Sequence, residues 1–79
     1  MSQDPYDIKT LEEFKQLASD FLKRLEIVKN NESINGMLKI LGIAYIHVPL
    51  DGADLAIAQS LYLYCAGKAL EAELSILMN

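Results

Sequence analysis

The first regular pattern of apolar and polar positions begins at Leu11 and predicts an amphipathic helix over residues 11–29. Apolar residues recur at alternating spacings of three and four, which places them on one side of a helix; they are Leu11, Phe14, Ala18, Phe21, Leu25 and Val28. Charged residues occupy the opposite side. Thr10 and Glu13 have the spacing of a capping box, in which the Thr10 hydroxyl accepts from the Glu13 amide and the Glu13 side chain returns to the Thr10 amide.

A second helix is predicted between the Asn30-Asn31 pair and Pro49, with Asn31 or Ser33 as its N-terminal cap. It carries two apolar stripes: Ile34, Met37, Leu38, Leu41 and either Ala44 or Tyr45 on one side, and Ile40, Ile43 and Ile46 on another. A short helix that is apolar on both sides is expected to be buried on both sides. Its small residues, Gly36 and Gly42, permit a neighbouring helix to approach closely.

A third helix is predicted to start at Asp51 or Asp54 and to continue through Leu61 and Cys65. Gly67 then stands where many helices end in a left-handed residue, so the pattern favours a turn there and a short last helix over 69–77. One continuous helix through Gly67 is the alternative. The expected fold is all-α, with three to four antiparallel helices in a single domain over residues 1–79, of which 1–10 form a flexible arm.

Charge is distributed unevenly between the two parts of the chain. Residues 1–32 hold five of the seven Lys and Arg and seven of the eleven Asp and Glu. Residues 33–79 hold only six charged side chains beside 29 apolar residues. Six charges are too few to solvate the outer side of a small helical bundle, so we expect another molecule to cover part of this surface.

Several partner classes and compartments are disfavoured by composition. The net charge of −4 and the absence of a basic stripe argue against nucleic acid as a direct partner. No apolar run reaches the length of a membrane span, and the polar residues 1–8 do not resemble a signal peptide. A cytoplasmic location is therefore expected.

The side chains that could support catalysis or metal binding are few and poorly spaced. His47 and Cys65 are the only His and Cys, so no metal site is expected. Cys65 lies in an apolar run and is interpreted as a core thiol. Glu71 and Glu73, two positions apart on a helix, do not face each other. We therefore expect a protein that is not an enzyme and that uses no cofactor.

Residues 58–72 resemble a tetratricopeptide-type hairpin, in which the first helix ends at glycine and the second opens with Gly-x-x-x-Glu-Ala; these positions are Gly67, Glu71 and Ala72. Small acidic proteins with this character are similar to the chaperones of bacterial type III secretion that hold the needle subunit. The resemblance implies a cytosolic protein that grips an amphipathic helix of a small secreted subunit and prevents premature assembly. A second small helical co-chaperone often accompanies such proteins.

The expected function is thus that of a protein-binding helical module, a chaperone or adaptor for a partner's amphipathic helix. Large apolar residues on helices with more than one apolar face are the candidate contacts; they are Ile43, Tyr45, Ile57, Leu61, Tyr64 and Leu70. Two alternatives stay open: a structural homo-oligomer that covers the same surface with a second copy, and a small inhibitor or regulator that caps a larger protein.

Overall fold

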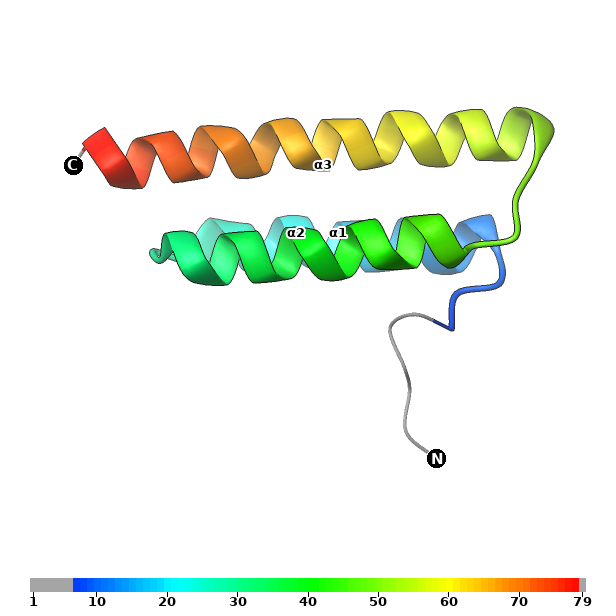
Figure 1. Ribbon diagram of the computed structural model, residues 1–79, viewed down its shortest axis with the longest axis horizontal. Helices are drawn as coiled ribbons and strands as arrows, with labels where there is room; N and C mark the ends of the chain where they lie inside the picture. The colour runs from blue at the N-terminus through cyan, green and yellow to red at the C-terminus, as the bar shows by residue number, and fades with distance from the viewer. Residues whose placement is uncertain (1–6, 79) are drawn as a thin grey trace.

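The computed structural model describes residues 7–78, which form three helices and no strand. They are α1 (Leu11–Ile27), α2 (Asn31–His47) and α3 (Gly52–Met78). Consecutive helices run in opposite directions, and α3 lies along the pair formed by α1 and α2 (Figure 1). The all-α prediction is confirmed, with three helices rather than four in the described part of the chain.

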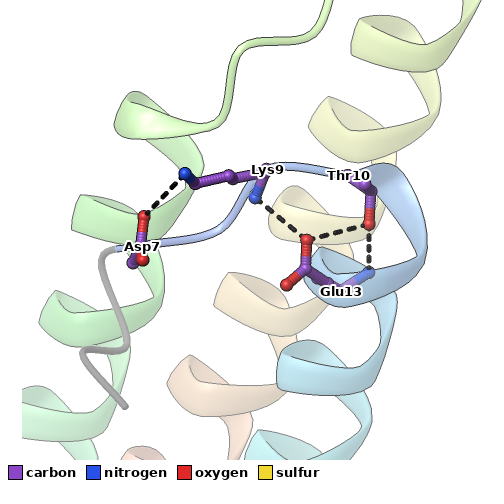
Figure 2. Close-up of polar contacts among 4 residues, drawn as sticks. All are labelled: Asp7, Lys9, Thr10 and Glu13. Atoms are coloured by element: carbon purple, nitrogen blue, oxygen red, sulfur yellow. Dashed lines mark hydrogen bonds and ion pairs between the residues drawn. The ribbon is translucent and has the colours of Figure 1, made fainter. Parts of the chain in front are cut away.

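The start of α1 is fixed by a capping box that differs in one bond from the sequence prediction. The Glu13 amide donates to Thr10 Oγ1 at 3.1 Å, as expected (Figure 2). The Glu13 carboxylate, however, accepts from the Lys9 amide at 3.2 Å and from the Thr10 hydroxyl at 3.1 Å, instead of from the Thr10 amide. The Glu13 carboxylate therefore binds the backbone of Lys9, the residue before the cap. Residues 1–6 of the predicted flexible arm lie outside the described residues, whereas Ile8 already packs against the core.

The end of α1 and both ends of α2 follow local rules of capping. Val28 is extended, so α1 ends at Ile27, two residues before the predicted position. Asn30 caps α2 by accepting from the Ser33 amide at 3.0 Å, and the predicted caps, Asn31 and Ser33, both lie inside the helix. At the other end Val48 is extended, as expected of a residue that precedes proline.

The third helix continues through Gly67, so the predicted turn and the separate helix over 69–77 are wrong. The only described glycine with a left-handed backbone is Gly52, with φ +58°, at the start of α3. Gly67 costs a helix interior about 1 kcal/mol relative to alanine. The residues around it are all strong helix formers, so the cost falls on a single position of a favourable segment; they are Ala66, Lys68, Ala69, Leu70, Glu71 and Ala72.

The core lies where the three helices meet. Its buried members are Phe14, Ala18, Phe21, Ile34, Leu41, Ala58, Cys65 and Ala69. Beside it an aromatic row joins the helices: Tyr45 of α2 packs against Phe14, with ring centroids 5.9 Å apart, and stacks on Tyr62 of α3 at 5.3 Å. A Cβ at Gly42 would lie 3.1 Å from Tyr62 Oη, so the glycine makes room for this ring, as its small size suggested.

Candidate protein-binding surface

The inner face of α3 buries small side chains. Ala58, Cys65 and Ala69 are fully buried, and no other residue of this 27-residue helix is buried to that extent. Leu61, Tyr62, Ala72 and Ile76 pack around them and are only partly buried. Small residues at a helix contact allow close approach of the neighbouring backbones, which explains how α3 seats on α1 and α2. Most of the large apolar side chains of α3 are thus left outside the core.

These large side chains form one surface, which we call the outer face of α3. Leu63, Leu70, Leu74 and Leu77 are 60, 58, 49 and 69% exposed, and their spacings place them along one side of the helix. A second row with a period of seven residues runs along their edge and comprises Ile57, Tyr64 and Met78, all exposed, with Glu71 between the last two. The C-terminal turns of α3 also extend past the ends of α1 and α2 (Figure 1). The outer face is therefore a long apolar strip that this chain does not cover.

A few polar groups border the outer face beside Tyr64. The Lys68 ammonium lies 5.6 Å from the centroid of the Tyr64 ring, within the range of a cation–π contact. Lys68 Nζ also lies 3.9 Å from a Glu71 carboxylate oxygen. Tyr64 and Lys68 line a shallow groove against α1, together with Leu22, Leu25 and Glu26. Tyr64 thus offers a partner an apolar ring held beside a charged pair.

The six candidate contacts predicted from the sequence do not form one site. Ile57, Tyr64 and Leu70 belong to the outer face of α3. Ile43 lies elsewhere, in a groove between α2 and α3 that Ile46 and Tyr62 also line. Tyr45 and Leu61 pack against the core, so they support the fold and do not face solvent as large exposed groups.

Sequence reasoning missed Leu63, Leu74 and Leu77, although a signal for them exists. Positions 63, 67, 70, 74 and 77 follow spacings of four and three, the same alternation that identified α1. A turn at Gly67 separates Leu63 from Leu70, Leu74 and Leu77, which by themselves span only about two helical turns. The full length of the strip appears only when the helix passes through Gly67.

The thiol of Cys65 is free and buried in the core. Burial raises the pKa of the Cys65 thiol, which keeps it protonated and unreactive near neutral pH. Within residues 7–78 no three His, Cys, Asp or Glu side chains gather as a metal site would require. In the same range no helix combines the length and the hydropathy needed to cross a bilayer.

Comparison with family models, with curated proteins and with solved structures gives no match to this chain. The function is therefore inferred from the geometry of the three helices alone.

Proposed function

We propose that this protein is a binding module that docks an amphipathic helix of a partner protein against the outer face of α3, in the manner of a chaperone or adaptor. The observation that supports this is the inverted distribution of side-chain size on α3. The helix buries alanines and a cysteine, while five leucines, an isoleucine, a tyrosine and a methionine remain exposed. An ordinary amphipathic helix does the opposite, because burying large apolar groups stabilises a small domain most.

The size of the outer face supports the same conclusion. At about 200 Å² of total surface for each large residue, the exposed fractions of its seven residues amount to roughly 800 Å². The largest apolar patch on a typical monomer covers about 300–600 Å², and such patches are often functional. One partner of a standard interface contributes about 800 Å². The outer face therefore has the area of a binding site.

The shape and charge of this surface indicate what kind of partner fits. A strip along a straight 27-residue helix is matched by another helix that presents a continuous apolar stripe. Besides Lys68, the charged residues of α3 are Asp54, Glu71 and Glu73, and the whole chain has a net charge of −4. A partner helix with Lys or Arg beside its apolar stripe is favoured by electrostatic complementarity.

The resemblance to needle-subunit chaperones contributes less to this proposal than it did to the sequence prediction. Residues 58–72, which carry the resemblance, lie inside one continuous helix and form no hairpin. A secreted needle-type subunit and a small co-chaperone stay predictions for the identity of the partner. Docking of an amphipathic helix does not depend on them.

Photo-crosslinking in the native host identifies the partner and tests the proposed surface together. A photoreactive amino acid in place of Leu63 of α3 is expected to cross-link to one partner protein, and the cross-linked peptide is expected to come from an amphipathic helix of that partner. The matched control carries the same group at Lys23, on the charged side of α1, and is expected to trap no such peptide. Equal trapping from both positions would place the binding surface elsewhere.

Affinity measurements with that partner then test individual contacts. Tyr64→Ala and Leu70→Ala are each expected to weaken binding by at least about tenfold, because central large residues of an interface contribute about 2 kcal/mol or more. Lys15→Glu and Lys23→Glu on α1 should change the affinity much less. Loss of binding in the α1 variants with retention in Tyr64→Ala would contradict the proposal.

A further inference from the structure

The side chains along the middle of the outer face change in size from one end of α3 to the other. Eight positions form a seam with alternating spacings of three and four: Ala53, Ala56, Ser60, Leu63, Gly67, Leu70, Leu74 and Leu77. All eight are exposed, and none is charged. Small residues predominate before position 68, and every seam residue after it is leucine. A helix with this gradient is complementary to a helix with the opposite gradient, which an antiparallel copy of itself provides.

The complementarity holds position by position when two copies of α3 overlap along their whole length. The helix spans residues 52–78, so in this register two facing residues have numbers that add to 130. Leu77 then faces Ala53, Leu74 faces Ala56, Leu70 faces Ser60, and Leu63 faces Gly67. Every leucine of the seam meets a small residue of the other copy, and the two-fold symmetry repeats each pair. Large side chains set against small ones let two helices pack closely without voids.

The residues beside the seam do not oppose this pairing. In an antiparallel pair the two edges each meet their own counterparts. Tyr64 falls near the two-fold axis on one edge, where its ring would lie beside its own copy. On the other edge Glu73 falls beside Gln59. Glu71 lies on the same edge as Tyr64 and falls beside Ile57 or Tyr64 of the other copy, so no two carboxylates face each other. The acidic residues therefore carry no evident repulsion into the interface.

The area is sufficient for a stable dimer. Each copy offers roughly 800 Å² of outer face, so a pair that covers both faces would bury about 1,600 Å² in total, which is the size of a standard specific interface. We propose that a second copy of this chain covers the outer face, through an antiparallel two-fold pairing of α3 over its whole length. The inference of a dimer depends only on the distribution of side-chain size along α3. A further role for the dimer, as a resting state from which the partner helix displaces the second copy, rests on the proposed function.

The variant Gly67→Leu distinguishes a dimer that depends on the pairing of large with small side chains from one held by apolar surface in general. In the single chain nothing lies within 4 Å of a Cβ at Gly67, and leucine favours a helix more than glycine does, so the variant is expected to fold. In the dimer the new side chain would collide with Leu63 of the other copy. Sedimentation equilibrium is expected to show a dissociation constant raised at least about tenfold. The double variant Gly67→Leu with Leu63→Ala, which exchanges large for small, is expected to restore the wild-type constant to within about threefold.

Two results of this experiment would overturn the inference. One is a wild-type chain that stays monomeric up to about 1 mM, a concentration at which even weak specific pairs associate. The other is a Gly67→Leu variant that associates as tightly as the wild type or more tightly, as an unspecific apolar surface would.

Cysteine cross-linking tests the direction and register of the helices. Ala56→Cys and Leu74→Cys face each other in the proposed pair, whereas the two copies of either one lie about 27 Å apart along the axis. A mixture of the two variants is expected to form a disulfide-linked dimer, and each variant alone is expected to form none. Wild-type protein is the background control, because Cys65 is buried. Cross-linking of Ala56→Cys with itself would indicate a parallel pair and contradict the proposal.

The outcomes also distinguish this inference from the proposed function. A chain that does not dimerise but whose position 63 cross-links to a partner helix overturns the dimer and keeps the function. A dimer in the expected register with no partner trapped at position 63 keeps the dimer and overturns the function.

Discussion

Helices α1 and α3 differ in the size of the apolar side chains that they bury. α1 buries Phe14 and Phe21 and turns its charged residues to solvent, so its stabilising groups lie within the chain. α3 buries Ala58, Cys65 and Ala69 and leaves its leucines outside. Large apolar groups contribute most where water is removed from them. The side chains of α1 therefore complete the fold of one chain, whereas those of α3 fit our proposal that a further helix covers its outer face.

The largest difference between the two helices is expected in how much the free energy of unfolding falls when a large apolar side chain is replaced by alanine. Phe14 is fully buried and packs against Tyr45, so Phe14→Ala is expected to lower the free energy of unfolding by about 3–5 kcal/mol. Leu63→Ala on the outer face of α3 should change it by no more than about 0.5 kcal/mol in a dilute, monomeric sample. Urea denaturation at low protein concentration measures both. Similar losses in the two variants would mean that the outer face is already covered within a single chain.

A smaller difference is expected between two helical glycines. Gly67 faces open space, so Gly67→Ala should stabilise the monomer by about 0.5–1 kcal/mol. At Gly42 a Cβ would press on Tyr62 Oη at 3.1 Å, and the Tyr62 ring is held by its stacking on Tyr45. Gly42→Ala should therefore stabilise less than Gly67→Ala or destabilise.

Thermal melts of the two glycine variants beside the wild type provide the test. Equal gains in stability would show that Tyr62 moves freely and that α2 and α3 are not in close contact at this point.

The sequence predicted α1 well because its apolar and charged residues separate cleanly and its cap, Thr10 with Glu13, is a strong local signal. It predicted α3 less well because Gly67 is a local signal for a helix end, whereas the continuity of the helix depends on the preferences of many neighbours. That one error also separated Leu63 from Leu74 and Leu77, so the full length of the apolar strip was not recognised.

The orientation of residues on the two-sided helices was the other part beyond the reach of sequence. Tyr45 and Leu61 were predicted to contact a partner, and the structure places both against the core, partly buried. When a helix has two apolar faces, periodicity identifies both faces but does not say which one the rest of the chain will cover. That choice depends on the shapes of the other helices, such as the space that Gly42 leaves for Tyr62.

The central claim is that another helix covers the outer face of α3 in the working protein. Hydroxyl-radical footprinting measures this directly, because covered side chains are protected from oxidation. In the single chain Leu63, Leu70 and Leu77 are exposed, as are the reference residues Ile27 and Ile46 at 78 and 76%. In concentrated protein, with each rate normalised to that of the free amino acid, we expect the three leucines to react several times more slowly than the two isoleucines. The same rates are then measured after addition of the partner identified by photo-crosslinking. This account would be contradicted if the three leucines were oxidised, under both conditions, at the rates expected from their exposure in the single chain.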